Sequence, residues 1–184
     1  MPNPTRPIGS LLVLGGARSG KSRYAQRLAE ASRLRPVLIA TAQAHDAEMA
    51  LRIACHAASR DARWTLVEEP AALGLALRRE ARNDRIVVVD CATLWLSNLL
   101  LRNDNLVTAT QDLAQTVAGL SGPVIFVSNE VGTGIVPENP LARAFRDAQG
   151  LLNQALAEAC DAVVLLNAGI ALCLKPSPEP KFRF

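Results

Sequence analysis

Gly15-Gly16-Ala17-Arg18-Ser19-Gly20-Lys21-Ser22 is the stretch that decides the fold, because it matches the pattern G-x-x-x-x-G-K-[ST] in full. The apolar run Leu11 to Leu14 precedes it and an amphipathic helical pattern follows it, as this motif requires. The glycines let backbone N–H groups curl around an anion, and the new helix directs its positive dipole end at that anion. Lys21 then reaches the β- and γ-phosphates of a nucleotide, and the Ser22 hydroxyl binds Mg²⁺. The stretch therefore predicts a phosphate-binding loop.

A metal-binding partner for this loop is expected at the end of a buried strand. The apolar run Ile86 to Val89 is followed directly by Asp90. A strand-terminal aspartate can hold Mg²⁺ directly or through water, although it can also simply cap the following turn. Because the phosphate loop is present, the sequence favours Asp90 as a metal-binding residue.

The rest of the chain alternates short apolar runs with helical patterns, which is typical of parallel strands joined by helices. Strands are predicted at Leu11–Leu14, Val37–Ala40, Ile86–Val89, Val124–Val127 and Val163–Leu166, with a further short one at Trp64–Glu68. Helices are predicted at Lys21–Arg33, Asp46–Arg60, Leu73–Arg82, Leu94–Leu101, Val107–Leu120 and Leu141–Cys160. We therefore expect an α/β fold of the P-loop NTPase (RecA-like) class, with a doubly wound, mostly parallel sheet flanked by helices. One nucleotide-binding domain should span residues 10–175, between proline-rich tails at 1–9 and 176–184.

Composition excludes several classes of function. The 20 Lys and Arg residues are nearly balanced by 17 Asp and Glu, and aromatic residues are few (four Phe, two Trp, one Tyr), so no nucleic-acid surface is expected. The four cysteines, one of them Cys55, form no CxxC pair and are expected to be free thiols rather than metal ligands. The apolar run near the N-terminus is too short for a signal peptide or a membrane span, so we expect a cytoplasmic protein.

His56 lies on the predicted helix Asp46–Arg60, in one stripe with Arg52 and Arg60 at i, i+4 and i+8. The flanking positive charge favours a neutral, nucleophilic imidazole and attracts phosphate. A solvated helix face with an ordinary surface histidine fits the same spacing, and this bland alternative is stronger still for His45, so spacing alone leaves both interpretations open.

Several segments together make the sequence resemble the adenosylcobinamide kinase/adenosylcobinamide-phosphate guanylyltransferase family of cobalamin biosynthesis. They are the phosphate loop, Ala40-Thr41-Ala42, the stretch from Asp46 to His56, and the long segment from Ser128-Asn129-Glu130 through Gly150 to Asn153-Gln154. The resemblance covers nearly all of Leu12 to Lys175, and the long segment makes it specific.

This resemblance implies two reactions on a corrinoid substrate. A nucleoside triphosphate phosphorylates adenosylcobinamide, and GTP then transfers GMP to the resulting phosphate, giving adenosylcobinamide-GDP and pyrophosphate. The family forms a guanylylated histidine, and His56 matches that position. GTP, ATP and Mg²⁺ are implied, as is a homo-oligomer, a trimer in the family. Lys21 and His56 are the implied catalytic residues. The implied nucleotide contacts are Gly15 to Ser22, Thr41, Ala42, Gln43, Ala57, Ala58, Ser59, Arg60, Glu68 and Asp90.

Some of the implied residues have a clear chemical rationale. Arg60 can meet phosphate oxygens, and Glu68 can accept hydrogen bonds from N1 and the exocyclic amine of guanine, although a glutamate at a strand end can also simply be solvated. Glu130 is a candidate for a metal or substrate-hydroxyl contact at the carboxyl edge of the sheet, although it too can simply be exposed. The loop Val131–Pro140 is predicted to be a binding loop rather than a helix.

Two other functions fit part of the pattern. A small-molecule P-loop kinase without a covalent intermediate would leave His56 incidental, and a nucleotide-switched module or RecA-like motor would have a similar sheet. A motor needs a nucleic-acid surface, which the charge pattern does not supply. The resemblance opposes both alternatives but leaves open whether this chain retains both activities.

Overall fold

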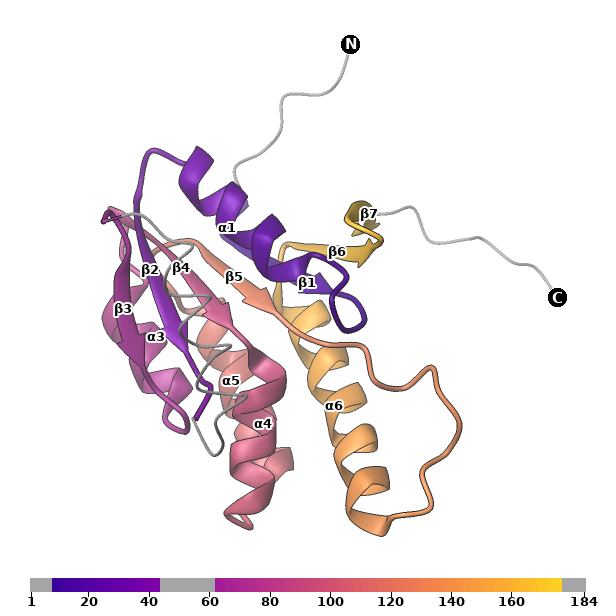
Figure 1. Ribbon diagram of the computed structural model, residues 1–184. Helices are drawn as coiled ribbons and strands as arrows, with labels where there is room; N and C mark the ends of the chain where they lie inside the picture. The colour runs from indigo at the N-terminus through magenta and orange to yellow at the C-terminus, as the bar shows by residue number, and fades with distance from the viewer. Residues whose placement is uncertain (1–7, 44–61, 177–184) are drawn as a thin grey trace, which may run out of the picture.

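The computed structural model describes residues 8–43 and 62–176. Its centre is a seven-stranded sheet in which the strand order is β3-β2-β4-β5-β1-β6-β7 (Figure 1). All neighbouring strands are parallel except the β6–β7 pair. The strands are β1 (Ser10–Leu14), β2 (Arg35–Ala40), β3 (Thr65–Glu68), β4 (Arg85–Asp90), β5 (Val124–Val127), β6 (Ala162–Asn167) and β7 (Ile170–Lys175).

Helices cover both faces of the sheet, as the continuous apolar runs in the strands require. The helix α1 (Lys21–Ala31) packs on one face against β1, β4 and β5 (Figure 1). The opposite face carries α3 (Leu73–Glu80), α4 (Ala92–Leu101), α5 (Leu106–Ala118) and α6 (Pro140–Ala159). No helix within the described ranges is long and apolar enough to cross a membrane.

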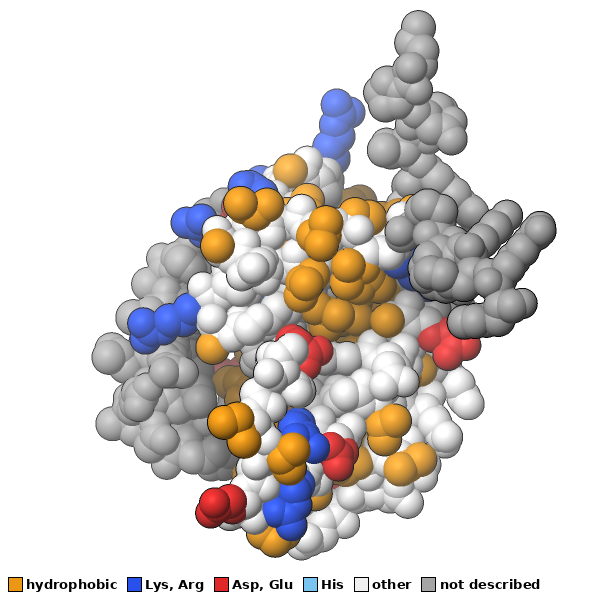
Figure 2. Space-filling model, turned by 90° about the vertical axis from the view of Figure 1, so that its right-hand side faces the viewer, with side chains coloured by type: hydrophobic (Ala, Val, Ile, Leu, Met, Phe, Trp, Pro, Cys, Tyr) orange, Lys and Arg blue, Asp and Glu red, His pale blue; other side chains and the backbone are white. Residues whose placement is uncertain are grey.

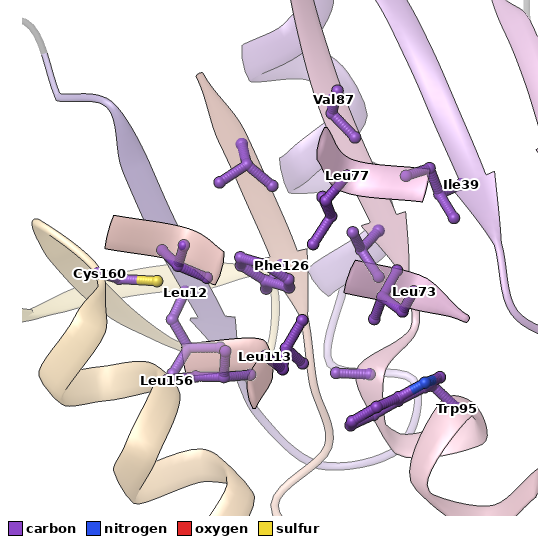
Figure 3. Close-up of a cluster of buried hydrophobic side chains, with 14 of the residues drawn as sticks. Leu12, Ile39, Leu73, Leu77, Val87, Trp95, Leu113, Phe126, Leu156 and Cys160 are labelled. Carbon is purple, nitrogen blue, oxygen red and sulfur yellow. The ribbon is translucent and has the colours of Figure 1, made fainter. Parts of the chain in front are cut away.

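The larger core cluster lies between the sheet and the four helices of the second face. Phe126 of β5 and Leu12 of β1 are fully buried there against Leu156 of α6 (Figure 3). Trp95 of α4 closes one side of this cluster, and its indole Nε1 donates a hydrogen bond to the Ala71 carbonyl at 2.7 Å. The strands are therefore fixed on both faces, which holds their carboxyl ends in a defined order.

Most of the predicted elements are confirmed. The five apolar runs form β1, β2, β4, β5 and β6, and the short Trp64–Glu68 run forms β3 at the edge beside β2. The ends of α1, α3, α4, α5 and α6 differ from the predicted ones by no more than two residues. The predicted helix Asp46–Arg60 lies outside the described residues.

The strand β7 was not predicted. A two-residue turn at Ala168 and Gly169, with φ of 51° and 80°, folds β7 back antiparallel on β6. Such turns are recognised from Asn-Gly or Asp-Gly pairs, and alanine rarely takes a positive φ, so the sequence carried little signal. Ile170 and Leu172 of this edge strand are 74% and 60% exposed, and Figure 2 shows hydrophobic side chains gathered on this face of the molecule.

Candidate active site

The loop between β1 and α1 has a backbone that only glycine allows at two positions. Gly15 has φ of 148°, and a Cβ there would lie 2.4 Å from the Leu166 carbonyl oxygen. Gly20 has φ of 98° and directly precedes α1. Any other residue at these positions would have to adopt a strained conformation, and at Gly15 it would also collide with backbone. The predicted phosphate loop is thus built into the contact between β1 and its neighbour β6.

Hydrogen bonds hold this loop from both sides. The Glu130 N–H donates to the Gly15 carbonyl at 3.0 Å, and the Gly169 N–H donates to the Ser19 carbonyl at 2.9 Å. The Ser19 hydroxyl is buried and has no hydrogen-bond partner among residues 8–43 and 62–176. A buried hydroxyl without a partner is costly, so this donor fits a loop that receives an anionic ligand.

Lys21 places its ammonium group in the same loop. The residue is 6% exposed, and its Nζ donates to the Gly16 carbonyl at 2.7 Å. Burial lowers the pKa of Lys21, while Coulombic interactions with Cys91 and Asp90 act in the opposite direction. The Asp90 carboxylate is therefore close enough to stabilise the charged amine.

The candidate Mg²⁺ ligands are half-buried and lie on neighbouring parts of the site. Ser22 is the second residue of α1, and Asp90 ends β4, in register with Ala40 of β2 and Val127 of β5. Within the described ranges no group of three or more His, Cys, Asp or Glu side chains forms a metal cage. Mg²⁺ in nucleotide sites is held by one or two protein oxygens together with phosphates and water, so a hydroxyl and a carboxylate fit this ion.

The residues beside Asp90 are fixed by buried hydrogen bonds. The fully buried Thr41 hydroxyl donates to the Cys91 carbonyl at 2.7 Å and accepts the Cys91 N–H at 3.0 Å. The Asn98 side-chain amide donates to the Thr41 carbonyl at 2.8 Å. Thr41 thus connects the end of β2 to the end of β4, while Ala42 is half-buried and Gln43 exposed beyond it.

Burial raises the pKa of the Cys91 thiol to about 11, so this thiol stays protonated at neutral pH and is no nucleophile.

Glu68 ends the edge strand β3 and is exposed. It is in register with Ala40, which on its other side is in register with Asp90. Two strand spacings of about 4.8 Å place the Glu68 backbone about 10 Å from that of Asp90, at the same carboxyl edge. His56 and the neighbouring implied contacts Ala57, Ala58, Ser59 and Arg60, together with His45, lie outside the described residues.

A buried polar network beneath this edge was not predicted. The Ser128 hydroxyl donates to Asn153 Oδ1 at 2.7 Å, and the Gln149 amide donates to both Ser128 Oγ and Asn153 Oδ1 at 2.9 Å. Thr93, the second residue of α4, lies within 3.5 Å of Ser128 Oγ. A weak signal existed, because Gln149 and Asn153 are spaced i, i+4 on the face of α6 that also carries Leu152 and Leu156.

The prediction that the loop Val131–Pro140 is not a helix is confirmed up to its last residue. The loop Val131–Pro140 contains neither helix nor strand until α6 begins at Pro140 itself, with the Asn139 side chain capping the helix. Glu130 turns its carboxylate towards its own loop, where Oε1 accepts the Gly132 N–H at 2.7 Å.

The family model for cobinamide kinase/cobinamide phosphate guanyltransferase matches residues 11–174. The chain belongs to this family. It is 50% identical to the bifunctional adenosylcobalamin biosynthesis protein CobP of Pseudomonas aeruginosa over 169 residues, which cover 91% of this chain and 98% of CobP. It is 39% identical to CobU of Salmonella typhimurium, with 90% and 99% of the two chains covered.

Solved structures support the fold of this family member. A type III secretion ATPase of pathogenic bacteria matches with a TM-score of 0.53 at 12% identity, covering 86% of this chain and 51% of that one. A Pyrococcus horikoshii OT3 protein matches with a TM-score of 0.54, also at 12% identity, covering 95% and 90%. At such low identity the likeness shows the fold alone, and it confirms the P-loop NTPase class.

Proposed function

We propose that this chain phosphorylates adenosylcobinamide with a nucleoside triphosphate and then transfers GMP from GTP to adenosylcobinamide phosphate through a guanylylated His56. The observation that carries the proposal is the phosphate loop, with its buried Lys21, beside Asp90 in a chain of the cobinamide kinase/guanyltransferase family. Two reactions on phosphorus can share one such site, because both need the triphosphate held and its charge neutralised.

In the kinase step the acceptor hydroxyl oxygen attacks the γ-phosphorus. The bond from that phosphorus to the β–γ bridging oxygen breaks, the nucleoside diphosphate leaves, and the hydroxyl proton is released. The loop N–H groups and the Lys21 ammonium bind the β- and γ-phosphates and stabilise the charge that develops on the leaving oxygen. The Ser19 hydroxyl, which has no partner in the described part of the chain, supplies one more donor for these phosphates.

Ser22 and Asp90 would hold Mg²⁺, which would neutralise part of the charge of the triphosphate when bound. Burial lowers the pKa of Lys21, and the charge of Asp90 acts against this by favouring the protonated amine. Lys21 thus contributes a cation and Asp90 a carboxylate, at adjacent positions of the site.

In the second reaction an imidazole nitrogen of His56 attacks the α-phosphorus of GTP. The bond between that phosphorus and the α–β bridging oxygen breaks, pyrophosphate leaves, and a phosphoramidate forms. A phosphate oxygen of adenosylcobinamide phosphate then attacks the same phosphorus, the P–N bond breaks, and His56 is free again. Arg60, one helical turn from His56 in the predicted helix, would bind phosphate oxygens in both halves of this exchange.

Glu68 is proposed to select guanine. Its carboxylate is exposed at the carboxyl edge, two strands from Asp90, and offers two acceptor oxygens to N1–H and the exocyclic amine. Adenine presents no matching pair of donors, so this contact would favour GTP. Ala42 and Gln43, which follow Thr41 after the end of β2, complete the proposed nucleotide contacts.

The corrinoid substrate and a second copy of the chain are the proposed partners. Curated relatives carry out steps of adenosylcobalamin biosynthesis by name, and the family resemblance implies a homotrimer. The exposed loop Val131–Pro140 lies directly after Glu130 and is the proposed contact for the large corrinoid.

The test uses GTP labelled at the α-phosphate. Incubation with Mg²⁺ should leave acid-labile, alkali-stable label on the parent protein and none on His56→Ala, because a phosphoramidate has this stability. His45→Ala is the matched control and should be labelled like the parent. Mass spectrometry should find a GMP adduct on the peptide that contains His56.

Label on both histidine variants, or on none of the three proteins, would contradict the guanylyl-histidine route. The second result would leave a P-loop kinase without a covalent intermediate as the better description. Transfer of the bound label to adenosylcobinamide phosphate would complete the assignment.

A further inference from the structure

Asn129 follows β5, the strand that lies between β1, which leads into the phosphate loop, and β4, which ends at Asp90. Strand β5 runs between β4 and β1, and Val127 is in register with both Asp90 and Val13. Two residues further along, Asn129 is therefore level with Gly15, and the following N–H, that of Glu130, donates to the Gly15 carbonyl. Asn129 thus stands between the two parts of the site that the triphosphate must bridge.

Two helices fix the backbone of Asn129. Its N–H donates to Thr93 Oγ1 of α4 at 2.8 Å, and its carbonyl accepts from Asn153 Nδ2 of α6 at 3.0 Å. Both supporting side chains are buried, at 6% exposure each, so neither bond competes with water. Holding both backbone groups of one loop residue in this way fixes the origin of its side chain.

The buried network gives this support its rigidity. Asn153 can donate to Asn129 because its oxygen is already occupied by Ser128 Oγ and by the Gln149 amide. The network thereby fixes the amide orientation of Asn153 with its nitrogen towards Asn129. The network therefore holds the backbone of Asn129 in place at the carboxyl edge of the sheet.

The side-chain amide of Asn129 itself makes no hydrogen bond in the described part of the chain, and the residue is half-buried. An asparagine amide offers two donors of neutral charge, which suit a phosphoryl oxygen that is still accepting charge. We propose that the Asn129 amide binds the γ-phosphoryl group of the nucleotide and orients it for transfer.

This inference rests on the proposed function and adds a residue to its first step. While the acceptor oxygen bonds to the γ-phosphorus and the bond to the β–γ bridging oxygen breaks, the Asn129 amide donates to a γ-phosphoryl oxygen that stays on the transferred group. It holds that group in line between Lys21 and the acceptor, and takes up no proton. A nucleoside diphosphate has no γ-phosphate, so the contact distinguishes triphosphate from diphosphate.

The experiment measures binding in a His56→Ala background, so that β,γ-imido-GTP is consumed neither at the α- nor at the γ-phosphorus. Calorimetry with Mg²⁺ compares this analogue with GDP for the background protein, Asn129→Ala and Asn129→Asp. We expect affinity for the analogue to fall about tenfold in the alanine variant and further in the aspartate variant, where a carboxylate faces phosphate. Affinity for GDP should change less than twofold.

Asn129→Asp is the variant that guards against misfolding, because it preserves side-chain shape and the two backbone hydrogen bonds. Gln111→Ala, which removes an exposed amide on α5, is the matched control and should bind both ligands like the background protein. Equal losses for GDP and the analogue, or no loss for either, would overturn the proposal, since a structural role does not distinguish the two ligands.

A kinetic measurement separates this proposal from the proposed function. With His56 intact, Asn129→Ala should lower kcat for phosphorylation of adenosylcobinamide by about a hundredfold and raise KM for the triphosphate. If the parent phosphorylates no cobinamide, the proposed function fails, and the ratio of analogue to GDP affinity still decides the role of Asn129.

Discussion

Lys21 brings its ammonium group into a buried position within the charge field of Asp90. Burial lowers the pKa of the folded-state amine below that of the unfolded chain, so charging this group disfavours folding. Between the folded and the unfolded pKa the unfolded state binds more protons, and stability rises with pH in that window. At pH values below both pKa values, the cost of the buried charge is fully present.

We therefore expect opposite effects of Lys21→Met on stability and on ligand response. The unfolding midpoint of the free protein should be no lower than that of the parent, because Met fills the same space without the charge. The parent should gain about 2.7 kcal/mol at GTP concentrations of 100 Kd, or about 5–10 °C, and the variant should gain far less. Thermal scans with and without Mg²⁺ and GTP measure both. An intact GTP response would show that Lys21 does not bind the phosphates.

At the scale of single residues, local requirements decide what the sequence reveals. Gly15, Gly20 and Lys21 are predictable because turn geometry and phosphate chemistry demand those residues at that spacing. No turn geometry or motif spacing in the residues around Asn129 requires an asparagine at that position. Its position depends on Thr93 and Asn153, which lie on two other elements, and only the folded chain brings them together.

Helix α6 meets the end of β5 through two buried amides whose hydrogen-bonding demands differ. Asn153 satisfies three partners, namely Ser128 Oγ, the Gln149 amide and the Asn129 carbonyl. Gln149 donates twice, but its buried Oε1 has no hydrogen-bond partner within the residues that the structure describes. Replacing a buried group costs most when it leaves its partners unpaired, and costs less when the group was itself unsatisfied.

We expect Asn153→Leu to lower the free energy of unfolding by about 3 kcal/mol and Gln149→Leu by at least about 1 kcal/mol less. The reason is that the first change removes three hydrogen bonds and leaves the Asn129 carbonyl without its partner, whereas the second removes two hydrogen bonds together with the unsatisfied Oε1. Urea denaturation of both variants beside the parent measures the difference. Equal losses, or a larger loss for Gln149→Leu, would show that Oε1 is satisfied in solution.

At the scale of elements, the apolar periodicity was sufficient to predict the buried strands and the five described helices. It failed at β7, because Ile170, Leu172 and Leu174 are exposed on an edge and the turn before them uses alanine at a positive φ. It also could not show that β3 lies beside β2, since strand order is set by packing between distant parts of the chain.

Across the whole molecule, the two ends of the parallel strands have different roles. The candidate site lies at their carboxyl ends. At their amino ends, both ends of the described chain are bound to the corner between α6 and β6. There the Asp161 carboxylate accepts the Gly9 and Ser10 N–H groups at 2.8 and 3.0 Å. At the same corner Lys175 Nζ, at the end of β7, donates to the carbonyls of Ala157, Glu158 and Cys160. A cation at this position also interacts favourably with the negative, C-terminal end of the α6 dipole.

Because this corner and the candidate site lie at opposite ends of the parallel strands, Lys175→Met should weaken the fold and leave the chemistry intact. Loss of a charged donor to three carbonyls is expected to cost about 2 kcal/mol and about 4–8 °C in the unfolding midpoint. Arg33 is exposed, and its side chain makes no hydrogen bond within the described residues. Arg33→Met is therefore the matched control and should stay within about 0.5 kcal/mol of the parent. At a temperature where all three proteins are folded, kcat for both transfer reactions should be the same. A fall in kcat for Lys175→Met under those conditions would mean that β7, through Gly169 and its bond to the Ser19 carbonyl, transmits changes at the amino ends of the strands to the phosphate loop.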